Sequence, residues 1–291
     1  MSKWKGIILA GGNGTRLSPH TLVTSKHLLP VYDKPLIYYS LSVLIYAGIR
    51  DVLLIVNQEH IDQYKVLLAD GAHLGMNIQY MIQSEPRGIA DAFIVGENFI
   101  GSRNVALVLG DNIFHGMGFL PLINKAMERS SGCSIFTYPV DDPSRFGVLT
   151  RGDDGMPLKI EEKPKDPKSN QAITGLYFLD NSCIEKSKKI NPSSRNELEI
   201  TSLLQQYMDE NSLLALEFGR GFAWLDTGTN DAMLDAARYI QLIEKRQGLK
   251  VACIEELAFL NKWITKEDLN KISLRYFNTS YAKYLKDCGS K

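Results

Sequence analysis

A glycine-rich turn directly after a short apolar run is the feature that most restricts how this chain can fold. Residues 6–10 predict a buried strand, and Gly11, Gly12 and Gly14 follow at once. Glycine lets the backbone turn sharply and approach a ligand closely, and consecutive N–H groups in such a turn bind anions. Arg16 adds a planar cation that can hold phosphate oxygens through two hydrogen bonds. The pattern therefore predicts a strand–loop unit that binds a polyphosphate.

Two familiar phosphate-binding loops do not fit this segment. The dinucleotide fingerprint requires a third glycine three residues after the second, and counted from Gly12 and Gly14 that position holds Leu17. The P-loop requires Gly-Lys followed by Ser or Thr, and the segment has no such step. A turn that only connects a strand to a helix is the structural alternative, but Arg16 beside the turn favours an anion site.

Alternating strand-like and helix-like segments in the first half predict an α/β fold. Apolar runs typical of buried parallel strands lie at 51–56, 78–82 and 105–109. Segments of helical length and spacing lie near 35–47, 60–70 and 88–100. Pro35 suits a first helical turn and Gly48 suits a C-cap. We therefore expect a mostly parallel central sheet with helices on both faces.

The pattern changes after about residue 130. Short strands are expected near 133–140, 146–150, 157–162 and 172–179, and helices at 198–209, at 229–247 and in the tail from about 251. Prolines punctuate the strand candidates, which favours a mixed or antiparallel extension of the sheet. The tail predicts a small C-terminal helical part.

Composition excludes several classes of protein. Lys+Arg and Asp+Glu are both 33 in a chain of 291 residues, so no global basic field points to nucleic acid or to an anionic membrane. The apolar runs are too short to cross a bilayer, and the first residues do not read as a secretory signal. The four cysteines are scattered, without a C-x-x-C pair. We expect a cytoplasmic protein with reduced thiols.

Two aspartates that follow predicted strands are candidate magnesium ligands. Asp111 comes directly after the run at 105–109, and Asp226 ends a short apolar segment before a glycine turn. Ligands of open α/β sheets bind outside the carboxyl ends of the strands, and Mg²⁺ is typically held by one or two carboxylates together with substrate phosphates and water. Each residue also has a purely structural interpretation. Asp111 could be a turn aspartate. Asp226 could be a helix N-cap, although Thr229 or Asn230 could cap that helix instead.

Two lysines are candidate phosphate ligands. Lys26 follows the glycine loop within the segment Ser25-Lys26-His27, and Lys163 ends the pair of glutamates before Pro164. A lysine ammonium suits phosphate, although most lysines are simply solvated at the surface. The histidines show no spacing typical of metal ligands.

Taken together, these segments resemble the glucose-1-phosphate thymidylyltransferases of the sugar nucleotidyltransferase family. The matching segments run in family order from about residue 5 to past residue 260, at 9–17, 25–35, 109–112, 161–164, 174–177, 197–201 and 224–229. The resemblance implies a Rossmann-like nucleotidyltransferase fold with a core over 1–247, divided into a nucleotide-binding half (about 1–130) and a sugar-binding half (about 131–247). It also implies a small helical C-terminal subdomain over 248–291 and a homotetramer.

The resemblance also implies a role for individual residues. Arg16, Lys26 and Lys163 are the implied catalytic residues, and Asp111 with Asp226 the implied Mg²⁺ ligands. The implied nucleotide-binding residues are Leu9, Gly11, Gly12, Gly14, Thr15, Arg16, Gln83, Gly88 and Asp111. The implied sugar-phosphate-binding residues are Leu109, Phe146, Gly147, Glu162, Lys163, Ile173, Thr174, Tyr177 and Arg195.

The implied reaction converts dTTP and α-D-glucose 1-phosphate to dTDP-glucose and pyrophosphate, the first step toward dTDP-deoxysugars such as dTDP-rhamnose. The amide of Gln83 can both donate and accept a hydrogen bond, which suits thymine or uracil. A UTP-using or dual-specificity pyrophosphorylase therefore stays open, as does a sugar-nucleotide-binding regulator without activity. The presence of every charged residue of the implied site disfavours the regulator.

Several positions depart from the family pattern. Arg87 and Ile89 stand where many relatives have aspartate and leucine, and Phe146 replaces a frequent tyrosine. Leu120, Pro121 and Leu260 occupy positions where many members bind an end-product sugar nucleotide through histidine, glutamate and arginine. We expect feedback by dTDP-rhamnose to be weak, absent or retuned to another deoxysugar.

Overall fold

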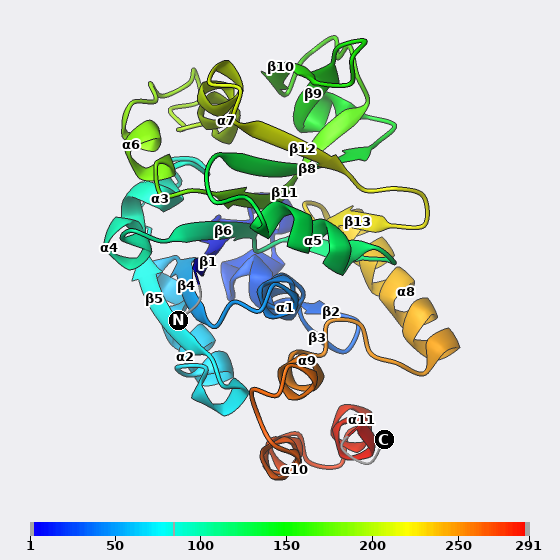
Figure 1. Cartoon of the computed structure of the whole chain (residues 1–291). Helices are drawn as coiled ribbons and strands as arrows, with labels where there is room; N and C mark the ends of the chain where they lie inside the picture. Colours follow the sequence, from blue (N-terminus) through cyan, green and yellow to red (C-terminus); the bar gives the residue numbers. More distant parts are fainter. Residues whose placement is uncertain (1–2, 84, 289–291) are drawn as a thin grey trace.

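A single mixed sheet organises the chain. The structure, a computed structural model, describes residues 3–83 and 85–288. Within them, nine strands form one sheet with the path β10-β9-β11-β6-β1-β4-β5, and β8 and β12 continue it beyond β11 (Figure 1). The strands are β1 (Trp4–Ala10), β4 (Asp51–Val56), β5 (Asn77–Ile82), β6 (Asn104–Leu109), β8 (Cys133–Pro139), β9 (Gly147–Arg151), β10 (Pro157–Glu162), β11 (Gln171–Leu179) and β12 (Leu213–Glu217).

The parallel part of the sheet confirms the expectation for the first half of the chain. β1 pairs in parallel with β4 on one side and β6 on the other, and β4 pairs in parallel with β5. The carboxyl ends of β1, β4 and β5 are level with one another, because Ala10 pairs with Val56 and Val56 with Ile82. The loops that follow these strands therefore emerge along the same edge, at the carboxyl ends where such sheets bind ligands.

β11 is the strand that reverses direction, as the expected mixed extension requires. It pairs antiparallel with β6 and with β8, and β12 adds in parallel to β8. Leu176 lies opposite Val108, the last but one residue of β6, so the residues of β11 that precede Gly175 extend beyond the end of β6. A second ladder, of β7 (Asn112–His115) with β13 (Ala223–Asp226), lies next to this edge. A short hairpin of β2 (Pro30–Val31) and β3 (Lys34–Pro35) follows the first loops.

Helices cover both faces, because side chains alternate along each strand. Ile8 belongs to a buried cluster with α1, α2, α5 and the C-terminal helices, and its neighbour Ile7 to a cluster with α3, α4, α6 and α7. The helices are α1 (Ile37–Tyr46), α2 (Ile61–Leu68), α3 (Asp91–Val95), α4 (Glu97–Ile100), α5 (Phe119–Met127), α6 (Cys183–Lys188), α7 (Ile200–Asp209) and α8 (Asn230–Gln247).

Two expectations for helices need correction. Pro35 lies in β3, and α1 begins at Ile37, because the chain first closes a small hairpin. The segment at 88–100 is not one helix: Gly96 ends α3 and precedes α4. A glycine there weakens the helix, and a Cβ on Gly96 would lie 3.0 Å from the carbonyl oxygen of Ala92.

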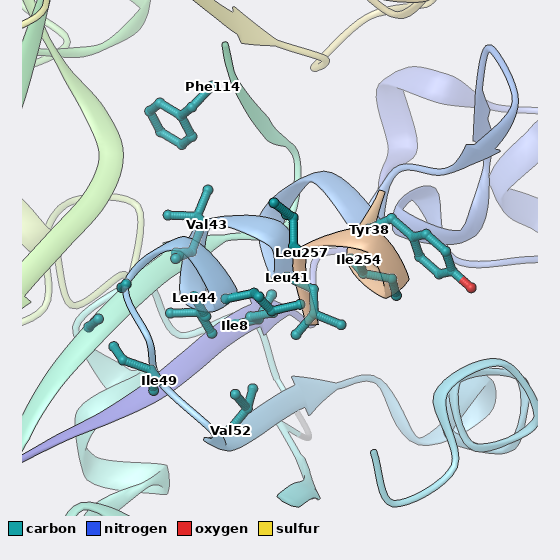
Figure 2. Close-up of a cluster of buried hydrophobic side chains, with 14 of the residues drawn as sticks. Ile8, Tyr38, Leu41, Val43, Leu44, Ile49, Val52, Phe114, Ile254 and Leu257 are labelled. Atoms are coloured by element: carbon teal, nitrogen blue, oxygen red, sulfur yellow. The ribbon is translucent and has the colours of Figure 1, made fainter. Parts of the chain in front are cut away.

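The C-terminal helices α9 (Ile254–Leu260), α10 (Lys266–Arg275) and α11 (Ser280–Cys288) pack on the face covered by α1. Figure 2 shows Leu41 and Leu44 of α1 facing Ile8 of β1, with Leu257 of α9 beside them. The described part of the chain contains no helix that is both long and apolar enough to cross a membrane.

A buried cluster of four charges ties this C-terminal part to the core. Lys34, only 3% exposed, contacts Asp33 of its own hairpin and Glu244 of α8, with 3.0 Å between its Nζ and the glutamate Oε1. Lys250 contacts the same two carboxylates, and the backbone N–H of Val251 donates to Glu244 at 2.9 Å. Two cations and two anions thus balance one another at the junction.

Candidate active site

The glycine loop forms a tight turn at the end of β1. Gly14 has a φ of 59° and caps the short 3₁₀ helix Thr15–Leu17. A Cβ at Gly14 would lie 2.8 Å from Cγ2 of Thr21 and 3.2 Å from Cβ of Lys26, so only glycine lets these segments meet. Leu17 is fully buried and anchors the loop, while Arg16 stays exposed at the cleft.

Two adjoining cavities lie along the carboxyl edge of the sheet. Their volumes are about 270 Å³ and about 350 Å³, and they share several lining residues, so we treat them as two lobes of one cleft. The shared residues are Arg16, Ile89, Leu109, Asp111, Glu162, Lys163 and Ile200. Gly12, Gln83 and Gly88 line the larger cavity, which we name the nucleotide lobe after the ligand that the sequence analysis predicts for these residues. Gly147, Ile173 and Asp226 line the smaller cavity, which we name the sugar lobe on the same basis.

Asp111 sits at the centre of a polar network after β6. Its Oδ2 accepts a hydrogen bond from Nζ of Lys26 at 2.5 Å, and its Oδ1 accepts one from Nδ2 of Asn112 at 2.8 Å. Burial alone would raise the pKa of Asp111, but it is lowered to about 2 by the charge of Lys26, by the His27 ring, which is charged only below about pH 4, and by these hydrogen bonds. The carboxylate is therefore held ionised and in a fixed orientation.

Asn112 links this carboxylate to two other strands, β11 and β13. Its side chain is buried, and its Oδ1 accepts hydrogen bonds from the backbone N–H of Gly175 at 3.0 Å and from Nε1 of Trp224 at 2.6 Å. In the ladder of β7 with β13 it pairs with Asp226. Since Thr227 also donates from its Oγ1 to the Asp111 carbonyl oxygen at 2.8 Å, the backbone itself brings the two aspartates together.

The electrostatics of this pair test whether a cation fits. Burial and the negative charge of Asp111 raise the pKa of Asp226 above its ordinary value, which means that two carboxylates face one another at some cost. Among the described residues, no group of three or more His, Cys, Asp or Glu side chains could hold a metal. Two carboxylates that need further oxygens suit Mg²⁺, which keeps waters and substrate phosphates as ligands.

Arg16 and Arg145 approach Asp226 from the cleft. Nη2 of Arg145 lies 3.5 Å from Oδ2 of Asp226. A Cβ on Gly228 would lie 3.1 Å from that same oxygen and 3.3 Å from Nη2 of Arg16, so Arg16 and Asp226 flank the glycine. The cations therefore stand where anionic substrates would enter between the carboxylates.

His27 is buried behind this network and stays neutral. Burial is the main cause that lowers its pKa to about 4, the charge of Asp111 acts in the opposite direction, and Lys26 lowers it further. Its Nδ1 lies 3.2 Å from Oγ of Ser25, which in turn lies 2.7 Å from the hydroxyl of Tyr64. This chain of contacts ties the turn that carries Lys26 to α2.

The far end of the nucleotide lobe is built around Gln83 and Gly88. The backbone N–H of Gln83 donates to Val56 and extends the sheet register, and its buried side chain donates from Nε2 to Oδ2 of Asp91 at 2.9 Å. Gly88 has a φ of 100°, and a Cβ there would lie 2.5 Å from the carbonyl oxygen of Leu198. Residues 85–90 therefore pack tightly against the segment that precedes α7. Its neighbour Ser84 lies outside the described residues.

The sugar lobe is lined by the strands β9, β10 and β11. Gly147 pairs with Glu162 across the β9–β10 hairpin. Ile173, Gly175 and Tyr177 line the cavity because they share one face of β11. Thr174 points to the other face: it is fully buried and is absent from the lining.

An aromatic contact closes the same lobe. The rings of Phe146 and Trp224 lie 5.0 Å apart between centroids, and both line the cavity. Oγ1 of Thr201 donates to Oε2 of Glu162 at 3.1 Å, which orients that carboxylate toward the lobe. A hydroxyl-bearing ligand would meet an apolar wall on one side and a fixed acceptor on the other.

Arg195 is held by three glutamates at the border of the lobes. Its Nη2 lies 3.1 Å from Glu162, 3.3 Å from Glu197 and 2.8 Å from Glu199. Lys163, whose Nζ is 3.7 Å from Glu162, lines both cavities. These cations are already paired, so an incoming phosphate would compete with the carboxylates for them.

Several residues of this site were not identified from the sequence. Asn112, Arg145, Trp224 and Thr201 all line the sugar lobe, and Asp91 holds Gln83. A signal existed for Asn112, Thr201 and Trp224, which lie in segments that match the family, at 109–112, 197–201 and 224–229. The positions of Leu120 and Pro121 lie elsewhere, in a separate cavity of about 340 Å³.

Comparisons with known proteins agree with this geometry. The sequence pattern of the family described as nucleotidyl transferase matches residues 5–242. A glucose-1-phosphate thymidylyltransferase of Neisseria gonorrhoeae is 50% identical over 281 residues, which cover 97% of this chain and 98% of the relative. One from Mycobacterium tuberculosis is also 50% identical, over 97% of each chain.

Solved structures share the fold. A Bacillus anthracis protein, provisionally assigned as a glucose-1-phosphate thymidylyltransferase, is 38% identical with a TM-score of 0.76, over 81% of this chain and 94% of its own. A UDP-glucose pyrophosphorylase is 22% identical with a TM-score of 0.72, over 82% and 98%, and shows the fold alone. The chain belongs to the nucleotidyl transferase family, among the glucose-1-phosphate thymidylyltransferases.

Proposed function

We propose that this chain transfers a thymidylyl group from dTTP to α-D-glucose 1-phosphate, releasing pyrophosphate and forming dTDP-glucose. The observation that carries the proposal is the convergence of Arg16, Lys26 and Lys163 with Asp111 and Asp226 around one cleft. Curated relatives at about 50% identity over nearly the whole chain bear the corresponding name. The product would enter the synthesis of dTDP-deoxysugars.

The glycine loop and the nearby cations would bind the triphosphate. Backbone N–H groups of a sharp glycine turn bind anions, and Arg16 next to them can hold phosphate through two parallel hydrogen bonds. Lys26 would exchange part of its contact with Asp111 for a phosphate oxygen. Gln83 and Gly88, at the other end of the nucleotide lobe, would contact the base.

The other lobe would hold the sugar phosphate. Glu162, oriented by Thr201, would accept hydrogen bonds from sugar hydroxyls. Lys163 and Arg195, at the border of the lobes, would bind the phosphate once it displaces their glutamate partners. The apolar wall of Phe146 would contact the sugar ring.

Mg²⁺ fits the pair Asp111 and Asp226, whose mutual repulsion raises the pKa of Asp226. When bound, Mg²⁺ would neutralise phosphate charge and orient the triphosphate. The protein's own groups would do the rest. The oxygen of the sugar phosphate is already ionised and needs no protein nucleophile, so positioning and charge neutralisation are the main tasks.

The three cations divide this neutralisation. Arg16 and Lys26 would hold the triphosphate so that the α-phosphorus faces the second substrate, with pyrophosphate leaving in line. Lys163 would hold the attacking phosphate against the repulsion of two polyanions. Removal of one contact that acts on developing charge commonly costs on the order of 10²–10³ in rate.

UTP is the second candidate nucleotide. Thymine and uracil differ by one methyl group, and a methyl in an apolar pocket is worth only about 1–3 kcal/mol. The amide of Gln83, buried at the end of the nucleotide lobe, would serve either base. A pyrophosphorylase that uses both nucleotides is therefore the runner-up.

The direct test is a pyrophosphate-release assay that crosses four nucleoside triphosphates with several sugar 1-phosphates, with and without Mg²⁺. We expect the highest kcat/KM for dTTP with glucose 1-phosphate, and dependence on Mg²⁺. A preference for UTP would favour the runner-up. Nucleotide binding without turnover under every condition would contradict the proposal and favour a regulator.

We also propose a homotetramer in the cytoplasm. The tetramer is implied by the resemblance, and sedimentation analysis would test it. The cytoplasmic location is supported by the free thiols of Cys133, Cys183 and Cys253, which are buried, because free cysteines are typical of a reducing compartment.

A further inference from the structure

A buried carboxylate next to Gln83 restricts what that amide can present to a nucleotide. Asp91, in the first turn of α3, is only 2% exposed. Its Oδ2 accepts a hydrogen bond from Nε2 of Gln83 at 2.9 Å. Its Oδ1 lies 3.8 Å from Nη1 of Arg87. This pair lies beside the nucleotide lobe that Gln83 lines.

The chemistry of the two groups fixes the orientation of the amide. An ionised carboxylate only accepts hydrogen bonds, whereas a glutamine amide has a donating and an accepting end. The NH₂ group must therefore face Asp91, and the carbonyl oxygen must point the other way. That oxygen would lie 3.0 Å from a Cβ at Gly11, so it points into the space that the glycine loop leaves free.

We propose that Asp91 is a specificity-determining positioning residue, which locks Gln83 as a hydrogen-bond acceptor toward the base. The proposal rests on the proposed function, since it assumes that Gln83 contacts the base. Thymine and uracil carry an N–H donor at N3, in the middle of the pairing edge, whereas cytosine carries an acceptor there. A locked acceptor that faces N3 therefore favours dTTP and UTP over dCTP.

The discrimination between dTTP and dCTP depends on whether the Gln83 amide can rotate. An unconstrained amide could rotate and present its NH₂ group to cytosine, and the site would then accept both classes of pyrimidine. With the NH₂ group held by Asp91, rotation would place two oxygens against one another, and binding of dCTP would place the Gln83 oxygen against an acceptor. Unmatched polar contacts in buried sites are costly.

The test is the Asp91→Asn variant, which keeps the shape of the side chain. An asparagine can offer either its oxygen or its NH₂ group to Gln83, so the amide is no longer locked. We expect the ratio of kcat/KM for dTTP to that for dCTP to fall by at least about tenfold. The loss with dTTP should appear in KM more than in kcat. Asp62→Asn makes the same chemical change at a side chain of α2 that is 93% exposed, and it should leave the ratio unchanged.

A double-mutant cycle separates positioning from a general structural effect. In a Gln83→Leu background, Asp91→Asn should not change the ratio further, because the group that Asp91 orients is gone. If the ratio changes there as well, or if Asp91→Asn alone leaves it unchanged, the proposal is wrong. Should Asp91→Asn fail to fold, Asp91→Ser, which also removes the carboxylate, gives the same comparison.

The same measurements distinguish this inference from the proposed function. If the unaltered protein releases no pyrophosphate from dTTP, the proposed function fails. If it turns over dTTP but Asp91→Asn keeps the wild-type ratio, only the inference about Asp91 fails.

Discussion

Asp226 pairs with Asn112 across the antiparallel ladder of β13 and β7, and the Asn112 side chain donates to the carboxylate of Asp111 at 2.8 Å. One ladder position therefore fixes both carboxylates of the candidate metal site, although 113 residues lie between Asn112 and Asp226 in the chain. The arrangement exists in the protein alone, so a nucleotide would bind to carboxylates that are already oriented.

Replacing Asn112 with aspartate should reduce turnover. The variant keeps an oxygen for the N–H groups of Gly175 and Trp224 but replaces the donor toward Asp111 with an acceptor. We expect kcat to fall at least about tenfold and the free energy of unfolding to fall by about 1–3 kcal/mol, measured by pyrophosphate release and by urea unfolding. Asn124→Asp, at an exposed position of α5, is the matched control. Unchanged kcat in Asn112→Asp would contradict the role of this amide.

Removing the charge of Asp226 should separate catalysis from stability. In Asp226→Asn we expect kcat to fall on the order of 10²–10³, while the fold persists. Because the pKa of Asp226 is raised by burial and by Asp111, its ionised form opposes folding at neutral pH, so without Mg²⁺ the variant should be at least as stable as the wild type. Thermal unfolding with and without Mg²⁺ checks this. Asp235→Asn, at an exposed side chain of α8, is the control, and wild-type turnover in Asp226→Asn would remove the metal role.

A side chain at Gly88 should weaken nucleotide binding. A Cβ there would lie 2.5 Å from the carbonyl oxygen and 2.6 Å from the nitrogen of Leu198, so in Gly88→Ala the segment must shift. We expect a rise in KM for dTTP of about tenfold or more, and a stability loss of about 1–3 kcal/mol from the positive φ and the contact. Gly248→Ala separates the two causes, since Gly248 has a φ of 70° but a Cβ added there would meet no heavy atom within 4 Å. It should lose stability but keep KM.

Acidic pH should destabilise the protein through His27. The pKa of His27 is about 4 in the folded protein, against about 6.5 for an exposed histidine, so between these values the unfolded chain binds more protons than the folded one. The contribution of neutral His27 to the free energy of unfolding is fully present above pH 6.5 and is lost as the pH falls toward 4. The loss amounts to about 2 kcal/mol at pH 5. A cation bound near Asp111 would lower the pKa of His27 further, so the stability would still fall as the pH falls.

The measurement compares urea unfolding of the wild type and of His27→Gln at pH 7 and pH 5. The wild type should lose about 2 kcal/mol more than the variant. His20→Gln removes an exposed histidine and should keep the wild-type dependence. An equal loss in wild type and His27→Gln would show that His27 does not cause it.

The positions of the parallel strands could be predicted because each of them is a continuous apolar run. The runs near β1, β4 and β6 are buried on both faces, so their pattern does not depend on their neighbours. The break at Gly96 was missed because the flanking residues have helical spacing, and a single glycine is not decisive. The hairpin of Pro35 was missed because proline suits both a helix start and a strand edge.

The site could be predicted only where function demands a particular residue type. The glycine loop and the two aspartates follow strand ends, and that placement is visible in the sequence. Asp91 was missed because a carboxylate inside a helical segment reads as solvent-exposed, and its partner Gln83 becomes apparent only in three dimensions. The resemblance implies that Thr174 binds the sugar phosphate, but Thr174 is fully buried and does not line the cavity.

The buried charges between α8 and the C-terminal helices bear on how the chain comes apart. Detaching those helices would remove Lys250 and leave Asp33 and Glu244 facing Lys34 alone. One unmatched negative charge would then remain, and the apolar face of α1 that packs against the C-terminal helices would be exposed to water, which is costly. We therefore expect the C-terminal helices and the sheet to unfold together, in one cooperative melting transition rather than two.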